Sequence, residues 1–259
     1  MDNNKFLALT KKMLKKDAKE DLFSKNGFIA KFGSEKECAL FLGLNPAGNE
    51  ENVKHESNKI YLNYIPEVKP KKEASKYFNN SYFGAIYKFM LKIVGDKFKW
   101  SWCNYDYEEI EKNIINNEEL ENYKNEIFNY YNAHKNKEYN LLIGDLYYYH
   151  TTDSGKLNDL IEKNNKYENI KEMVNCHIDV ILENKKTLKF IYVNNAKASK
   201  DIAKALTGKE NVNDSYIEYE YKNEKIKIFL GGMLSGQHAM DIYSRNRLEN
   251  EIKKYMKLQ

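Results

Sequence analysis

A single polar side chain follows the most apolar strand-like stretch of this 259-residue chain. Residues 38–44 are continuously apolar and too short for a helix, which is typical of a buried strand in a parallel sheet. Asn45, Pro46 and Gly48 then indicate a tight turn. Ligands of open α/β sheets bind at the carboxyl ends of the strands, so Asn45 lies where chemistry is usual. The alternative is a turn that needs Asn and Gly only for its backbone shape.

Two later segments place further polar groups at predicted strand ends. Residues 139–147 form a second predicted strand that contains Asp145, and the last predicted strand runs into a glycine-rich loop at 231–238. Neighbouring parallel strands end at the same edge, so we expect Asn45, Asp145 and this loop to converge. The loop has the composition of a phosphate cradle, because its glycines permit close backbone approach and Ser235 offers a hydroxyl. A simple cap for the following helix is the alternative.

The only two arginines of the chain lie just beyond this loop. Arg245 and Arg247 stand out among 42 basic residues that are otherwise all lysine. Arginine grips phosphate or carboxylate in a planar, bidentate manner that lysine does not reproduce. Two residues apart on a helix they point in different directions, so at most one faces the predicted site. The other is expected to pair with Glu249 or Glu251.

The chain alternates predicted strands and helices, which favours an α/β fold. This order predicts a single domain with three α/β/α layers around a mostly parallel central sheet. It includes a helical N-terminal segment (about 1–30, with one amphipathic helix over 5–24) and a helical insertion (about 105–135). Asn195 is a suitable cap for a helix over 196–206. Further strands are predicted at 189–195, 215–222 and 225–230, and further helices at 82–94, 156–184 and 239–257.

Composition narrows the class of protein. Hydrophobic residues make up 42% of the chain, enough for a core, and the net charge of +4 excludes a histone-like polycation. The start of the sequence lacks a signal-peptide pattern, and no apolar run is long enough for a membrane helix, so a cytoplasmic protein is expected. Cys38, Cys103 and Cys176 lack C-x-x-C spacing, which argues against disulfides and against zinc or iron–sulfur sites. No metal and no cofactor are expected.

Residues 42–48, Leu-Gly-Leu-Asn-Pro-Ala-Gly, resemble the first motif of the uracil-DNA glycosylase superfamily. The similarity is greatest to its mismatch-specific and single-strand-selective branches, which carry Gly-x-Asn-Pro-Gly. In architecture the resemblance covers residues 38–250, but only this motif matches closely in sequence. The resemblance implies a four-stranded parallel sheet between helices. It also implies a monofunctional DNA N-glycosylase that flips one nucleotide and leaves an abasic site. The expected partner is single- or double-stranded DNA, with no membrane and no obligate protein partner.

The resemblance assigns roles to individual residues. It implies that Asn45 orients the attacking water and that His238 stabilises the departing base, although His238 is offset from the family's usual His-Pro-Ser and is equally suited to capping a helix. Met233 or Gln237 would be the wedge that enters the duplex. The base pocket would be formed by Gly43, Leu44, Pro46, the stacking residue Tyr64 and Asp145. DNA contacts would come from Gly48, Ser235, Gly236, Gln237 and one of Arg245 and Arg247.

Asp145 departs from the family, which has a base-reading Asn at this strand end. An ionised Asp only accepts hydrogen bonds, so it suits the N4 amine of cytosine rather than uracil. A protonated Asp145 would still read uracil, and a capping role is the structural alternative. The expected substrate is therefore uracil or a cytosine-type or hypermodified cytosine base, in repair or in defence against modified phage DNA. A noncatalytic DNA-binding protein and a small-nucleoside hydrolase remain alternative functions.

The aromatic and histidine residues near Asp145 receive structural assignments. Tyr147, Tyr148 and Tyr149 follow it directly, and alternation along a strand predicts that they point to opposite faces. His150 and His177 are expected to have structural roles, because neither has neighbours at metal-ligand spacing.

Overall fold

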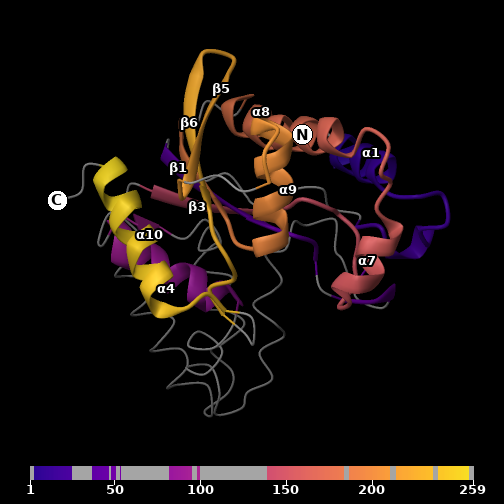
Figure 1. The fold of residues 1–259 in the computed structure, drawn as a ribbon, viewed down its shortest axis with the longest axis horizontal. Coiled ribbons are helices and arrows are strands. Elements are labelled where there is room, and N and C mark those ends of the chain that lie inside the picture. Colours follow the sequence, from indigo (N-terminus) through magenta and orange to yellow (C-terminus); the bar gives the residue numbers. More distant parts are fainter. Residues whose placement is uncertain are drawn as a thin grey trace, which may run out of the picture.

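A β-sheet forms the centre of the molecule (Figure 1). Among the described residues it has six strands, in the order β2-β3-β1-β4-β6-β5. The structure is a computed structural model that describes residues 3–24, 37–46, 48–50, 53, 82–94, 98–99, 139–183, 187–210, 214–235 and 239–256. All neighbouring strands are parallel except β5, which is antiparallel to β6. The strands are β1 (Glu37–Gly43), β2 (Phe98–Lys99), β3 (Tyr139–Asp145), β4 (Thr187–Val193), β5 (Tyr216–Tyr221) and β6 (Glu224–Leu230).

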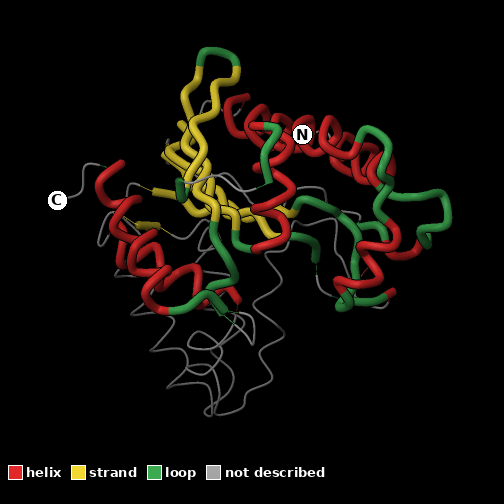
Figure 2. The backbone as a smooth tube through the Cα atoms, in the orientation of Figure 1, coloured by secondary structure: helices red, strands yellow, loops and turns green. Residues whose placement is uncertain are grey.

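Helices cover both faces of this sheet (Figures 1 and 2). One face packs against α1 (Asn3–Met13), α7 (Ser154–Leu160), α8 (Lys166–Glu183) and α9 (Ala196–Thr207). The other packs against α4 (Tyr82–Val94) and α10 (Ile242–Tyr255). The predicted three-layer α/β/α fold with a mostly parallel sheet is confirmed.

The central strand β1 shows why its sequence is continuously apolar. Leu40 and Leu42 lie in the core beneath α1, α8 and α9, whereas Ala39 and Phe41 lie in the core beneath α4 and α10. Successive side chains of a strand point to opposite faces, and here both faces are buried. In the edge strand β5, the exposed residues Glu218 and Glu220 alternate with buried Ile217 and half-buried Tyr219 and Tyr221. This strand joins β6 through a two-residue turn.

The structure differs from the sequence prediction in how elements are divided. The resemblance implies four strands, but short β2 and antiparallel β5 extend the sheet to six. The helix predicted over 5–24 ends at Met13, and a 3-10 turn at Glu20–Leu22 follows. The helix predicted over 156–184 is two helices, because Ile161 is extended and Asn165 adopts a left-handed conformation with φ 55°. The predicted insertion at about 105–135 lies outside the described residues.

Side-chain caps set the starts of three helices. The Asn195 side chain accepts hydrogen bonds from the backbone N–H groups of Lys197 and Ala198, which confirms its predicted capping role. Asp153 caps α7 in the same way. Asp241 caps α10, so this helix begins at Ile242 rather than at the predicted residue 239.

Gly231 and Gly232 provide a matched test of packing at the end of β6. A Cβ at Gly231 would lie 2.3 Å from the hydroxyl oxygen of buried Tyr192, whereas one at Gly232 would lie 3.5 Å from Met240 Cβ. We expect Gly231→Ala to lower the free energy of unfolding by about 1–3 kcal/mol through overpacking. Gly232→Ala should change it by no more than about 0.5 kcal/mol, measured by urea denaturation. Equal effects of the two variants would contradict this account of the strand end.

Candidate functional site at the carboxyl edge of the sheet

The carboxyl ends of the four central strands lie in one continuous register. Gly43 at the end of β1 is the partner of Asp145 at the end of β3. On the other side of β1, the pairing with β4 continues when the N–H of Asn194 donates to the carbonyl of Leu42 at 2.8 Å. The ladder between β4 and β6 carries the same row to Gly231. The row across this edge is therefore Asp145, Gly43, Asn194 and Gly231.

This row faces the layer formed by α4 and α10. The residues two positions earlier on the four strands all lie in the core beneath those helices: Ile143, Phe41, Tyr192 and Phe229. Residues two apart on a strand share a face, so the row continues this largely aromatic layer at the edge of the sheet. Two polar side chains thus alternate with two glycines directly beyond a packed aromatic core.

Asn45 connects the turn after β1 to the loop after β3. Its side-chain Nδ2 donates to the backbone carbonyls of Pro46, Tyr149 and Thr151 at 3.0, 3.3 and 2.9 Å. Because the carboxamide is planar, its Oδ1 faces away from these three oxygens. Within the described part of the chain, Oδ1 has no hydrogen-bond donor. Asn45 therefore fixes the turn with one atom and keeps the acceptor atom for another partner.

Backbone hydrogen bonds extend the pairing of β1 with β3 beyond the strand ends. They join Leu146 N–H to Gly43 O at 3.0 Å, Tyr147 N–H to Leu44 O at 2.9 Å and Thr151 N–H to Pro46 O at 3.2 Å. The side chain of Leu44 packs in the core beneath α1 and α8, so only its backbone lies at the edge. Gly48 has a φ of 145°, a conformation that favours glycine. The backbone hydrogen bonds therefore hold the turn after β1 against the loop after β3.

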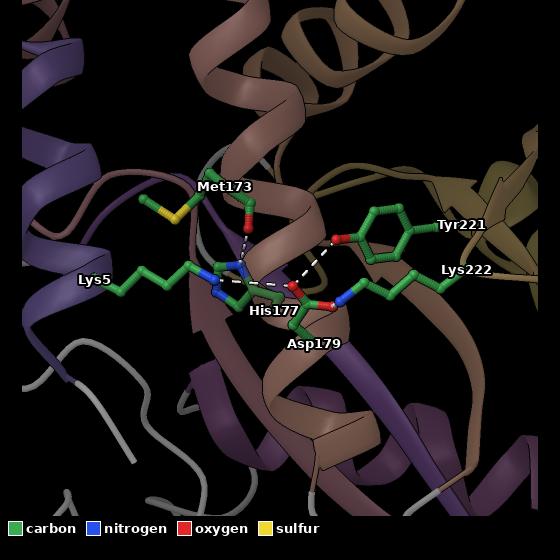
Figure 3. Close-up of polar contacts among 6 residues, drawn as sticks. All are labelled: Lys5, Met173, His177, Asp179, Tyr221 and Lys222. Carbon is green, nitrogen blue, oxygen red and sulfur yellow. Dashed lines mark hydrogen bonds and ion pairs between the residues drawn. The ribbon is translucent and has the colours of Figure 1, made fainter.

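Asp145 begins a hydrogen-bonded chain that runs into the core. The residue is 6% exposed, and its N–H donates to the Tyr148 hydroxyl oxygen at 3.3 Å. The Tyr148 hydroxyl lies 3.0 Å from His177 Nε2. On the other side of the ring, His177 Nδ1 lies 2.8 Å from the carbonyl of Met173 (Figure 3). A carbonyl only accepts, so Nδ1 carries the proton and Nε2 accepts from Tyr148.

The protonation of this chain follows from burial. Desolvation lowers the pKa of His177 to about 4, and the hydrogen bond to Met173 opposes the shift only partly. Desolvation first, and the nearby Asp145 charge second, raise the pKa of Tyr148. Both rings are therefore neutral near pH 7. His177 has the structural role that the sequence predicted, because it holds the tyrosine that supports the Asp145 backbone.

The prediction for the three consecutive tyrosines is wrong. Tyr147, Tyr148 and Tyr149 all lie in the same core, beneath α1 and α8. β3 ends at Asp145, so strand alternation does not apply to the residues that follow. The next segment instead pairs with the N-terminal region, where Phe23 bridges to Tyr149 and the N–H of His150 donates to Leu22 O at 2.8 Å.

Asn194 is a site residue that the sequence analysis did not identify. It is 1% exposed, and its Oδ1 accepts the backbone N–H of Leu234 at 3.0 Å. The amide orientation is fixed, because exchanging its atoms would place two donors face to face. Its Nδ2 is buried and has no hydrogen-bond partner in the part of the chain that the structure describes. The available signal was the pair of asparagines after a strand, of which only Asn195 is needed for the helix cap.

A second cluster of polar side chains lies on the opposite face of the sheet, beneath α8 and α9. Tyr147 Oη and Asp201 Oδ2 are buried and have no hydrogen-bond partner among the residues described. Asp201 Oδ1 pairs with Lys166 Nζ at 2.6 Å. Burial first, and the Asp201 charge second, raise the pKa of Tyr147. Burial also lowers the pKa of Lys197 in the first turn of α9. These groups do not face the Asp145–Asn194 row.

The loop after β6 is closed on itself next to the row. The N–H of Met240 donates to Met233 O at 2.7 Å, and Met233 forms a bridge with Ala239. Ser235 is half-buried within this loop, as is Met233, the residue predicted as a wedge. The other residues predicted here, Gly236, Gln237 and His238, lie outside the described residues, and so does Tyr64.

The two arginines have different surroundings on α10. Arg245 Nε donates to Glu249 Oε1 at 3.1 Å, and buried Glu249 also pairs with Lys92 at 3.5 Å. Arg247 is exposed. The first turn of the helix also presents Ile242 and Tyr243, whose exposed fractions are 65% and 83%. These two residues were not predicted as site residues, because nothing in the sequence indicates that the helix begins with an uncovered apolar pair.

A separate ionic cluster lies near the C-terminal end of α8, around Asp179 (Figure 3). Asp179 accepts from Tyr221 at 3.1 Å and from Lys222 at 2.6 Å, and Lys5 lies 3.8 Å away. The cluster joins α1, α8 and the turn between β5 and β6. The residues of this turn, Lys222 and Asn223, have φ values of 50° and 65°, as expected for a type I′ hairpin. We assign this cluster a structural role.

Two kinds of feature are not found in the described ranges. There, no group of three or more His, Cys, Asp or Glu side chains is placed to hold a metal ion. Across those same ranges, no helix is long and apolar enough to cross a membrane.

Two comparisons with known proteins give no match. The chain matches no protein-family model, and no curated protein matches its sequence. Function is therefore inferred from the site itself.

His177 makes the stability of the fold depend on pH. Its folded pKa of about 4 lies below the ordinary value of 6.5, so the unfolded chain binds more protons between these pH values. Stability contributed by neutral His177 is complete above pH 6.5 and is lost as the pH falls towards 4, by up to about 1.4 kcal/mol per pH unit. We expect His177→Gln, which retains a donor and an acceptor, to flatten the difference in unfolding free energy between pH 7 and pH 5. An unchanged difference in urea denaturation would argue against this role.

Proposed function

We propose that this protein is a monofunctional DNA glycosylase that hydrolyses the N-glycosidic bond of a flipped cytosine-type nucleotide. The observation that carries the proposal is the geometry of Asn45, which is held through its Nδ2 at the end of the central strand, next to the row that contains Asp145. The resemblance of residues 42–48 to the first glycosylase motif supports the same role. So does the three-layer fold with parallel central strands.

Asn45 is suited to orient a water molecule. Its Oδ1 accepts a hydrogen bond from water, whose oxygen attacks C1′ of the deoxyribose while the bond from C1′ to the base nitrogen breaks. The electrons of that bond leave with the base, and the water proton is transferred to the departing base. The transition state is oxocarbenium-like, as in glycoside hydrolysis generally. A rigid turn supports this chemistry because a preorganised group needs no rearrangement during the reaction.

Asp145 favours a cytosine-type base. Its backbone is fixed by the register with Gly43 and by the Tyr148 hydroxyl, so the side chain starts from a fixed point at the strand end. A carboxylate accepts from an exocyclic amine such as cytosine N4 and repels the O4 oxygen of uracil. Substituents on C5 do not alter the amine, so this contact also suits modified cytosines. Repair and defence against modified phage DNA are both consistent with such a substrate.

The rim of the site offers groups for DNA. Arg247 is exposed on α10, and Ser235 is half-buried in the loop that precedes this helix. Both side chains are suited to donate hydrogen bonds to DNA phosphates. Ile242 and Tyr243 at the start of α10 provide uncovered apolar surface, which is suited to unstacked bases. The overall charge of +4 is compatible with DNA binding through a local surface.

The first test is base release from oligonucleotides. Single- and double-stranded substrates would carry uracil, mismatched thymine, cytosine, hydroxymethylcytosine or glucosylated hydroxymethylcytosine, with alkali to reveal abasic sites. We expect release of a cytosine-type base, and an abasic strand that stays intact until alkali is added. Asn45→Ala should slow release by about 100-fold or more, as expected for loss of a group that stabilises the transition state. Exposed Asn158→Ala on α7 is the matched control and should retain activity.

Because Asn45 also holds the turn, thermal unfolding must show that the Ala variant is folded. Salt-sensitive DNA binding without release of any base would instead indicate a noncatalytic DNA-binding protein. Hydrolysis of free nucleosides without affinity for DNA would indicate a small-nucleoside hydrolase.

Tyr243 gives a test of the DNA-binding rim. We expect Tyr243→Ala to weaken binding of a single-stranded oligonucleotide by about 5- to 100-fold, the range for loss of one base–aromatic stack. The side chain is 83% exposed, so thermal stability should stay unchanged. Fluorescence anisotropy at fixed salt would measure the affinity. An unchanged dissociation constant would remove Tyr243 from the DNA-binding surface.

A further inference from the structure

We propose that Asn194 reads the base together with Asp145, and that the two residues bracket the Watson–Crick edge of a cytosine-type base. In this arrangement Asn194 Nδ2 donates to O2 of the base, and the N4 amine of the base donates to Asp145. The inference rests on the proposed glycosylase function and identifies the atoms that select its substrate.

The first support is the unpartnered amide of Asn194. Among the described residues, its Nδ2 has no hydrogen-bond partner, and it is buried in a residue that is 1% exposed. A buried donor without an acceptor destabilises a protein, so such groups are rare unless a ligand or water supplies the acceptor. Its Oδ1 is already used by the N–H of Leu234, which leaves Nδ2 as the atom for a ligand.

The second support is the position of Asn194 in the sheet. Asp145 ends β3 and Asn194 directly follows β4, the two strands that flank β1, and both residues lie on the face covered by α4 and α10. Gly43 lies between them in the register and contributes no side chain to this face. Because neighbouring strands are about 4.8 Å apart, the two backbones are separated by about 10 Å. That separation suits a planar base hydrogen-bonded at both ends.

The separation also decides which base is complementary. Two residues on either side of the base contact the opposite ends of its Watson–Crick edge, positions 4 and 2 of a pyrimidine. Cytosine offers a donor at N4 and an acceptor at O2, which matches Asp145 and the Asn194 amide. Uracil offers acceptors at both ends, so its O4 would face the Asp145 carboxylate. Guanine offers an amine and a carbonyl oxygen in the reverse order, and it therefore belongs in the test.

The sharpest test changes the substrate and leaves the protein intact. A cytosine analogue with sulfur in place of O2 keeps the N4 amine but accepts hydrogen bonds poorly. We expect the wild-type protein to release it about 10-fold more slowly than cytosine, as for the loss of one hydrogen bond. Asn194→Asp should remove this difference, because its carboxylate cannot donate to either atom. Equal release of the two bases by the wild-type protein would overturn the inference.

A pair of neighbouring substitutions tests the residue itself. Asn194→Asp keeps an oxygen for the Leu234 N–H but replaces the donor, and it should slow cytosine release by about 10- to 100-fold. Asn195→Asp makes the same change one residue later and keeps a good helix cap, so it should retain full activity. Binding of a non-cleavable 2′-fluorinated cytidine in DNA should weaken in the first variant only. Equal behaviour of the two variants would refute the role of Asn194.

Asp145→Asn separates the contribution of each end. It replaces the acceptor at position 4 with an amide that can donate to O4, so we expect uracil release to appear. Uracil and cytosine share O2, so adding Asn194→Asp to Asp145→Asn should reduce uracil release by a similar factor. Equal uracil release by Asp145→Asn with and without Asn194→Asp would count against the inference.

The outcomes distinguish this inference from the proposed function. Release of uracil or guanine but of no cytosine-type base by the wild-type protein would keep the glycosylase function and overturn the assignment of Asn194 and Asp145. Absence of base release from every DNA substrate would overturn the proposed function and this inference with it.

Discussion

The parallel register of β3, β1, β4 and β6 is the constraint on which the candidate site depends. It brings together residues from four distant parts of the sequence and aligns them at one edge. Because side chains alternate between faces, the register also decides that Asp145 and Asn194 share the α4 and α10 face. A slip of one residue in β4 would move Asn194 to the opposite face. The packing of both faces by apolar side chains prevents such a slip.

Polar groups at this edge hold the structure together as well as having the chemical roles proposed above. Asn45 joins the turn after β1 to the loop after β3 through three carbonyls, and the same bonds direct its Oδ1 away from them. The Asp145 N–H donates to the Tyr148 hydroxyl, which in turn donates to neutral His177. Rigid support of this kind is what precise positioning of a reacting group requires. Substitutions at Asn45 are therefore expected to change stability as well as the proposed activity, so each variant needs both measurements.

Local sequence predicted the elements better than their boundaries. The apolar runs of β1 and β4 and the cap at Asn195 were recognisable, because burial on both faces and capping leave local signals. The break between α7 and α8 was not, since Asn165 adopts its left-handed conformation without a glycine to mark it. The tyrosines after Asp145 were misassigned because the end of β3 depends on its partner strand and on the N-terminal segment.

The sequence by itself determined the α/β class, the order of the strands along the chain and the polar residues at two strand ends, Asn45 and Asp145. These follow from apolar periodicity and turn residues, which are local properties. Only the tertiary structure decided that Asn194, rather than Asn195, belongs to the row with Asp145. Its Oδ1 accepts the N–H of Leu234, a residue 40 positions away in the chain, and this bond orients the amide so that Nδ2 has no partner among the described residues. Such pairing arises from the packing of β4 beside β6 and leaves no pattern in the local sequence.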